Sequence, residues 1–547
     1  MKRSWGVFSP KTLVPVLAIG AVAFGTVGLM QLLNRHGEAA IQLLPANAVM
    51  AMSFDNTPSP QQVPLFNEIK AAMDDSGLNA KIDEFLLRAD PKGTLQKIRR
   101  ELRGSFAVGI FGGIFENVKN EPDILIIAAL YNRNSAESLM ADFATKQKEG
   151  DLEYYLVSDK NTYVAFHNNY VLVSNRVSGL KRAFEVAKGE AKSLYEEPEF
   201  KNARSLLPSD ATFMTFISGK ALAKNDPQTL KEIKPFGFSE NTWFAYSITL
   251  RKEGILIDTT QPADPSNPVF AKWVSKMPTL HYSVLEEMPA GALGAAALSN
   301  PSSWWDIFRD ALKLSGEAED REILEGIHEL EEIFGLSFEK DFLPAFRGEV
   351  NAALYPPKEK NSDPYFVISI DNSNNGKATE IALQLIEKAN AGKFDSEKKI
   401  RFDETKMGEY RVFRIRENSP EAKEIAIAIN QDKVLFVYGK ELLDKIVAGV
   451  GSESLLHSDA FMKLREDSES RASLSVDMYQ LVELLEQSAP IPPDVNLKQL
   501  LSQRELTANW VLTEKASTFR LVIPLDLPEV IRTVGKQVQK AEAQMKT

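Results

Sequence analysis

The chain alternates between short runs in which every second residue is apolar and longer runs in which apolar residues recur every third or fourth position. The first pattern is typical of half-buried β-strands, and the second of helices that pack one face on a sheet. The strands arrive in groups rather than singly between helices. This order favours mainly antiparallel sheets covered by helices, an α+β class.

The same series of elements occurs twice along the chain. The segment 103–111, RGSFAVGIF, corresponds to 347–355, RGEVNAALY, and the segment 43–56 corresponds to 287–300, in both cases 244 residues apart. The same order then continues in both copies, with a strand, a helix, a three-strand group, a second helix and closing strands. Because every element has a partner in the same order, the sequence predicts an internal duplication.

Three prolines between 262 and 268 separate the two copies, and proline interrupts regular structure because it lacks a backbone donor. We therefore predict two tandem duplicated domains, each with its own helix-covered sheet, at 41–265 and 281–528, with a linker at 266–280. Such domains are expected to pack about a pseudo-twofold axis and to leave a cleft between them. Residues 529–547 have apolar side chains on one helical face and are predicted to form a C-terminal amphipathic helix that packs on its own domain.

Residues 12–34 contain no charged side chain, and basic residues precede them. As a helix, residues 13–33 would span about 31 Å, close to the thickness of a hydrocarbon core. The positive-inside rule then places residues 1–11 in the cytoplasm and the body of the chain across the membrane. We predict a transmembrane signal anchor at 12–34 in front of the two domains; a cleavable signal peptide is the alternative.

Composition narrows the range of functions. The 547 residues have a formal net charge of −11, so the surface repels phosphate backbones and nucleic acid is not an expected partner. The chain has no cysteine, which removes disulfides, thiolate nucleophiles and cysteine-ligated zinc.

The sequence contains no recognisable catalytic or cofactor motif. Its five histidines lack the spacing of paired metal ligands, and phosphate-binding and dinucleotide-binding loops are absent. The segment 371–376, DNSNNG, begins like a calcium loop, but position twelve of that loop is Ala382 instead of glutamate, so a turn that caps the next helix explains it better. We assign no catalytic, cofactor-binding or metal-binding residue and expect no cofactor. Whether the chain is an enzyme stays open, and a non-enzyme is favoured.

Five residues are candidates for a cleft or partner-facing site. Trp304 and Trp305 are adjacent on an expected helix, so only one of them can point deep into a core. His281 precedes the second copy and has no evident structural role. Arg103 and Arg347 recur at the same position of the two copies, although an Arg-Gly pair at the start of a strand is more often structural.

The Pro-Ala turn before a strand, the repeated Arg-Gly strand, the order of elements and the apolar N-terminal segment resemble a bacterial family catalogued as domain of unknown function 3352. The likeness covers about residues 41–525. It implies an exported bacterial protein and supplies no catalytic residues. In a bacterium, the anchor predicted at 12–34 would cross the inner (cytoplasmic) membrane in a single pass, with the bulk of the chain extracytoplasmic.

These features together predict a membrane-anchored extracytoplasmic protein of the bacterial cell envelope that acts as a non-enzymatic binding or scaffold protein. An envelope protein or an apolar ligand is the expected partner. A hydrolase acting on wall polymer or lipid is one alternative, and it would need paired carboxylates or a nucleophile dyad. A carrier or chaperone for apolar ligands is another, and it would need an apolar cavity of several hundred Å³.

Overall fold

The structure, a computed structural model, describes residues 40–545 apart from short stretches within that range. These stretches are 55–57, 90–93, 113–121, 142–143, 158–161, 235–237, 264–269, 271–274, 283–284, 306–308, 310–324, 330, 333, 358, 360–361, 373–375, 393–400, 416–424, 466–468 and 489–494.

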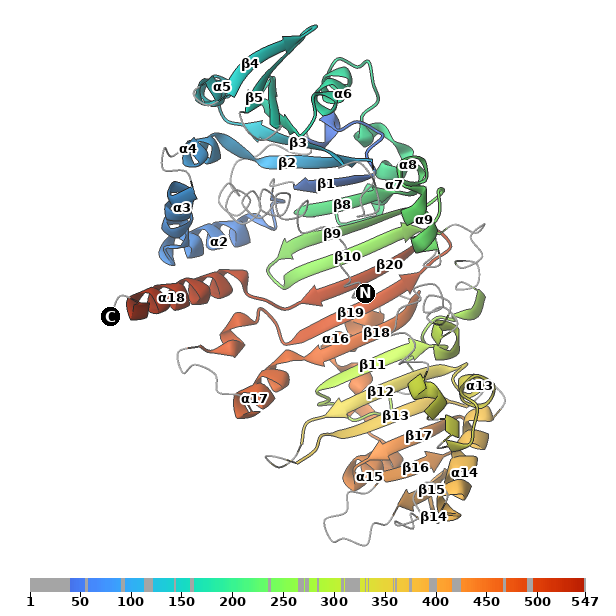
Figure 1. Cartoon of the computed structure of the whole chain (residues 1–547). Helices are drawn as coiled ribbons and strands as arrows, with labels where there is room; N and C mark the ends of the chain where they lie inside the picture. The colour runs from blue at the N-terminus through green and yellow to red at the C-terminus, as the bar shows by residue number, and fades with distance from the viewer. Residues whose placement is uncertain are drawn as a thin grey trace.

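The described residues build one sheet of 20 strands, in which all the neighbouring strands are antiparallel (Figure 1). The first half of the sheet contains β1 (Met50–Phe54), β2 (Leu102–Phe111), β3 (Asp123–Leu130), β4 (Ala144–Glu149), β5 (Leu152–Val157), β6 (Thr162–His167), β7 (Tyr170–Ser174), β8 (Phe213–Ser218), β9 (Trp243–Arg251) and β10 (Gly254–Pro262). The second half contains β11 (Gly294–Ser299), β12 (Glu349–Tyr355), β13 (Tyr365–Asp371), β14 (Phe402–Met407), β15 (Tyr410–Ile415), β16 (Ile425–Ile429), β17 (Lys433–Tyr438), β18 (Ser470–Asp477), β19 (Glu505–Leu512) and β20 (Ala516–Ile523).

The two halves have the same strand order and meet through their last strands. The pairings run 4-5-6-7-3-2-1-8-9-10 in the first half and 14-15-16-17-13-12-11-18-19-20 in the second, and β10 pairs with β20. Figure 1 shows this mirrored order, from β4 at one end to β14 at the other.

Helices lie along the sheet between and beyond these strands. Their bounds are α2 (Val63–Asp75), α3 (Leu78–Ala89), α4 (Thr94–Glu101), α5 (Arg133–Ala141), α6 (Val177–Ala187), α7 (Pro198–Leu206), α8 (Gly219–Asn225), α9 (Pro227–Ile233), α13 (Leu343–Ala345), α14 (Lys377–Asn390), α15 (Lys440–Ala448), α16 (Asp459–Arg465), α17 (Met478–Ser488) and α18 (Leu527–Met545).

Strand register carries the duplication down to single residues. Phe54 pairs with Phe106, and Leu298 pairs with Val350, so both partners shift by 244 residues between the halves. Strand pairing also gives the equivalent residues of β8, β9 and β10 in their counterparts β18, β19 and β20. By this register the counterpart of Asp258 is Arg520, 262 residues later.

Asp258 and Arg520 pair with each other where the halves meet. The Arg520 Nε donates to the Asp258 Oδ1 at 2.7 Å, and Asp258 is only 1% exposed. Burial raises the pKa of Asp258, and the Arg520 charge opposes that rise. A residue that pairs with its own counterpart lies on the pseudo-twofold axis, so opposite charges occupy equivalent positions there.

The expected fold of two tandem domains, each with its own sheet, is wrong. β10 and β20 pair over eight residues, from Ile255–Ile523 to Pro262–Ala516, so one sheet continues through both halves. The halves therefore meet edge to edge instead of across a cleft. The sequence pattern could not reveal this, because an edge strand and an interior strand alternate in the same way.

Residues that pair across antiparallel strands point to the same side of the sheet, which defines two faces. Face A carries Phe54 in the first half and Leu298 in the second; face B carries Ala51 and Ala295, three residues earlier on the same strands. On face B each half has a large core, which α6 and α7 cover in the first half and α15 and α16 in the second. On face A of the first half, Phe54, Phe106 and Phe213 pack with α2 and α18.

The C-terminal helix α18 packs mainly on the first half, whereas the sequence predicts that it packs on its own half. Leu527 and Ile531 of α18 join the face A core of the first half, and the Gln539 side chain donates to the Ser76 carbonyl at the end of α2. Gly535 permits this close approach, because a Cβ there would lie 2.3 Å from the Cβ of Ser76. The helix thus ties the two halves together.

The predicted transmembrane helix, residues 12–34, lies outside the described residues. Within the described part of the chain, none of the helices is both long and apolar enough to cross a bilayer. The structure therefore gives no support to the transmembrane part of the predicted fold.

Candidate binding sites

An apolar groove with a volume of about 620 Å³ opens on face A of the second half. Strands β11, β18, β19 and β20 form its floor, and the segment 301–305 adds a side chain from above. Its apolar lining consists of Ala296, Ala297, Leu298, Trp304, Ala472, Leu474, Ala508, Trp510 and Phe519. Among the described residues that line the groove, none has a charged side chain.

Small residues create the groove where the first half has large ones. By the repeated register, three positions that hold Met52, Phe213 and Tyr246 in the first half hold Ala296, Ala472 and Ala508 in the second. In the first half these large side chains, together with α2 and α18, fill face A. Replacing three large side chains by methyl groups removes that filling and leaves a surface that accepts another apolar body.

Aromatic rings border the groove. The Trp304 and Trp510 rings meet edge to face with centroids 4.6 Å apart. Their indole nitrogens donate to the Ser299 carbonyl at 3.2 Å and to the Ser517 hydroxyl at 2.8 Å, which fixes both rings. Phe519 is 38% exposed, although it lies on a central strand. Apolar surface held rigidly and left open to solvent is typical of a ligand or partner site.

A second, polar pocket of about 190 Å³ lies on face B of the same half. Ser475 and Glu505 line it, with Phe461 of α16 behind them. The first half fills the equivalent space with the rings of Phe200, Phe216 and Trp243, whose successive centroids lie 5.3 Å and 6.3 Å apart. By register, Ser475 stands where Phe216 is, and Glu505 stands where Trp243 is.

Two carboxylates of this pocket, Asp477 and Glu505, oppose each other across β18 and β19. Burial raises the pKa of Glu505, and the Asp477 carboxylate adds to that rise. For Asp477 burial acts in the same direction, but hydrogen bonds from Arg504 and Gln480 outweigh it and lower the pKa. The Arg504 Nε donates to the Asp477 Oδ2 at 2.7 Å.

Asp477 has a structural role that does not depend on any ligand. Its Oδ1 accepts the backbone N–H groups of Tyr479 and Gln480 and so caps α17. The equivalent residue of the first half, Ser218, caps α8 in the same way through the Ala221 N–H. A divergent pKa pair can mark an acid and a base, but here one member is a helix cap whose carboxylate is already saturated.

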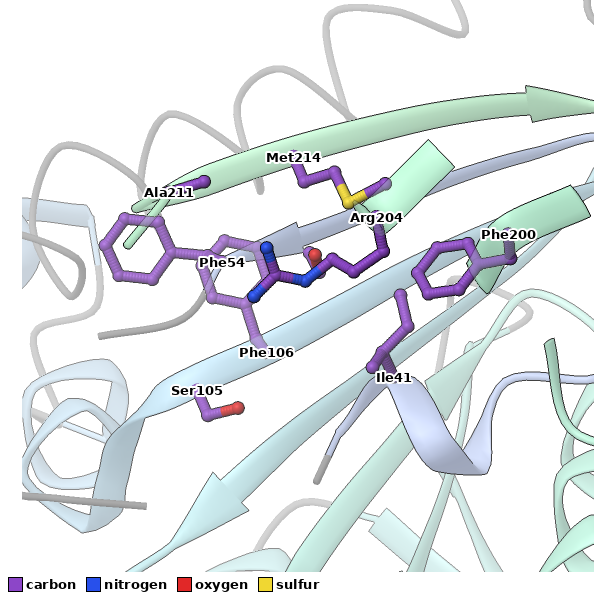
Figure 2. Close-up of a pocket in the computed structure, with 9 residues that line it drawn as sticks. Ile41, Phe54, Ser105, Phe106, Phe200, Arg204, Ala211 and Met214 are labelled. Carbon is purple, nitrogen blue, oxygen red and sulfur yellow. The ribbon is translucent and has the colours of Figure 1, made fainter. Parts of the chain in front are cut away.

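A small cavity of about 20 Å³, enough for a single water, lies in the first half. Figure 2 shows Arg204 and Met214 near Phe54 and Phe106, with Phe200 beside Ile41. The Phe54 and Phe106 rings stack at 5.3 Å, and the Arg204 guanidinium donates to the carbonyls of the chain after α7. This cavity is too small for an organic ligand.

The structure separates the two tryptophans that the sequence singled out. Trp304 lines the groove, while the Trp305 ring packs edge to face on Phe338 with centroids 4.9 Å apart. That division follows from the helical offset between adjacent residues.

The other three candidates lie outside both pockets. Arg103 of β2 stacks on the ring of Tyr131, which follows β3, with its Cζ 5.1 Å from the ring centroid. Arg347 is exposed just before β12. His281 is exposed, and its backbone N–H donates to the Glu349 carboxylate at 2.7 Å. The structure does not bring these three side chains together with the groove.

Sequence reasoning missed the residues that make the groove. The signal was present: the aligned segments 43–56 and 287–300 set Met52 against Ala296, and β11 is a run of small residues. This pattern does not by itself predict a groove, because small residues alone do not show whether another part of the chain fills the space. The calcium-like turn lies partly outside the described residues, and in the described part the structure has no group of three acidic or histidine side chains placed to hold a metal.

Comparisons with known proteins place the chain in a family without assigning an activity. No curated protein matches it. Two solved structures, crystal forms I and IV of TP0453, share 12% and 13% identity with it. They cover 41% and 42% of this chain and 77% and 81% of their own, with TM-scores of 0.23 and 0.24. The model of one family matches residues 12–509, and the chain therefore belongs to the family described as Protein of unknown function (DUF3352).

Proposed function

We propose that this protein is a non-enzymatic binding protein of the cell envelope that holds an apolar ligand in the groove on face A of the second half. The observation that carries the proposal is the difference between the halves. In the first half, large side chains and two helices fill face A; in the second half, alanines line a groove of about 620 Å³ on that face. That volume lies in the range of small-ligand sites, about 300–1,000 Å³.

The lining of the groove sets the chemistry of the ligand. Tryptophan, phenylalanine and leucine side chains favour an apolar body, and the absence of charge among the described lining residues disfavours an ionic group inside. Gln261 also lines the groove and offers an amide to a polar end group. An uncharged amphipathic molecule, with its apolar part against Trp304 and Trp510, fits this arrangement.

The envelope location rests on the sequence. Residues 12–34 have no charge and follow a basic start, which supports export of the body of the chain. A reporter enzyme fused after Thr547 tests this: we expect activity only outside the cytoplasm, and activity confined to the cytoplasm would contradict the proposed location.

Binding is tested with the neutral fluorescent probe N-phenyl-1-naphthylamine and the full chain. We expect saturable binding with enhanced probe emission, and Ala508→Tyr, which restores the first-half residue at the floor of the groove, should weaken it by about tenfold or more. Ala352→Val also restores a first-half residue on face A but lies outside the lining, so it should bind like the wild type. Equal binding by all three proteins would overturn the assignment of the groove.

A further inference from the structure

The polar pocket on face B is a second site, independent of the groove. We propose that it binds a small molecule through a primary ammonium group, which Glu505 and Ser475 hold. The inference goes beyond the proposed function, because the two sites lie on opposite faces of β11 and β18 and share no lining side chain.

The first step of the argument is space. In the first half, Phe216 and Trp243 fill this position, and both are buried in the core. In the second half, Ser475 and Glu505 replace them and leave about 190 Å³, several times the volume of one water in the liquid, about 30 Å³. Both replacements change an aromatic ring to a hydrogen-bonding side chain, so the space is polar as well as open.

The second step is unmet hydrogen bonding. Ser475 is 7% exposed and lines the pocket, and among the described residues none forms a hydrogen bond with its hydroxyl. The Glu505 carboxylate likewise has no hydrogen-bond donor in the described part of the chain. A hydroxyl and a carboxylate that both line the pocket and have no partner among the described residues favour a ligand that brings hydrogen-bond donors.

The third step is charge. The Arg504 Nη2 lies 2.6 Å from the Asp477 Oδ2 and neutralises that carboxylate. Asp459 and Lys463 of α16 carry opposite charges and move the pKa of Glu505 in opposite directions, so they offset each other. The Glu505 carboxylate is then the unbalanced charge of the pocket. A group with one positive charge and several N–H donors, a primary ammonium, satisfies the charge and both hydrogen-bonding side chains together.

Calorimetric titration of the full chain with ethanolamine at neutral pH tests the proposal. We expect saturable binding, with no binding of choline, which has the same hydroxyl but no N–H donor. Glu505→Gln should weaken ethanolamine binding by about tenfold or more, because it removes the charge without changing the shape of the side chain. Glu514→Gln, in the exposed turn after β19, makes the same charge change outside the pocket and should bind as the wild type does.

Absence of ethanolamine binding, or equal binding by the Glu505→Gln variant, would overturn the assignment. Retained binding of the naphthylamine probe by that variant shows that the chain is folded and that the groove is intact, so the two proposals fail separately. Co-sedimentation with vesicles of phosphatidylethanolamine or of phosphatidylcholine distinguishes the source of the ammonium. A preference for the first indicates a lipid headgroup, and binding of free ethanolamine without that preference indicates a soluble amine.

Discussion

The two halves of the sheet have the same strand order and the same register but differ in how their faces are filled. In the first half, aromatic side chains fill the positions that are open in the second: Phe213 and Tyr246 on face A, and Phe216 and Trp243 on face B. In the second half, alanines and polar residues stand there, and a groove and a pocket result. In our proposal, the filled first half contributes stability and the second half supplies the binding sites.

The largest expected effect is on the packing of the first half. Phe54→Ala leaves a cavity in the core under α2 and α18 and should lower the free energy of unfolding by about 3–5 kcal/mol. The equivalent change in the second half, Leu298→Ala, should cost about 1 kcal/mol, because Leu298 already borders an open groove. Chemical denaturation measures both. Equal losses would show that the second half is packed as tightly as the first, which would break the comparison.

The next largest effect on stability is expected at the pseudo-twofold axis, where Asp258 and Arg520 occupy equivalent backbone positions but carry opposite charges. Arg520→Ala leaves the buried Asp258 carboxylate without its partner and should cost about 1–3 kcal/mol. The exchange Asp258→Arg with Arg520→Asp should recover more than half of the loss that Asp258→Arg causes alone, because the backbone is symmetric there. No recovery would mean that the surroundings of the axis are not equivalent.

The pH dependence of the same pair has a definite sign. Because burial raises the pKa of Asp258, the folded chain keeps a proton that the unfolded chain releases. The contribution of Asp258 to stability is therefore greatest at low pH and falls as the pH rises from the ordinary aspartate value through the raised one. Arg520→Ala removes the charge that opposes this rise, so the fall should become larger in that variant.

The smallest effect is expected at the polar pocket. Glu505→Gln removes a carboxylate whose pKa burial has raised, so without ligand the variant should be slightly more stable than the wild type, by less than about 1 kcal/mol. The gain should be present above the raised pKa and disappear as the pH falls and Glu505 becomes protonated. Thermal unfolding at several pH values measures it. A loss of stability at neutral pH would indicate that Glu505 is a structural residue.

Local features were predictable because they depend on neighbours in the chain. The repeat of RGSFAVGIF and RGEVNAALY correctly indicated like surroundings, since β2 lies between β1 and β3 and β12 lies between β11 and β13. Trp304 and Trp305 are both candidates in the sequence because two adjacent residues of a helix cannot both point deep into a core, but only the structure shows that Trp304 is the one at the groove. The proposed domain boundaries and the envelope location stay predictions.

The sequence by itself determined that one series of strands and helices is used twice and which side chains of each strand share a face, because alternation and order are local properties of the chain. The tertiary structure alone decided that β10 and β20 join, that α18 crosses to the other half, and that the alanines of β11, β18 and β19 line a groove. Those outcomes depend on contacts between residues hundreds of positions apart. An alanine has the same local signature whether a helix covers it or nothing does.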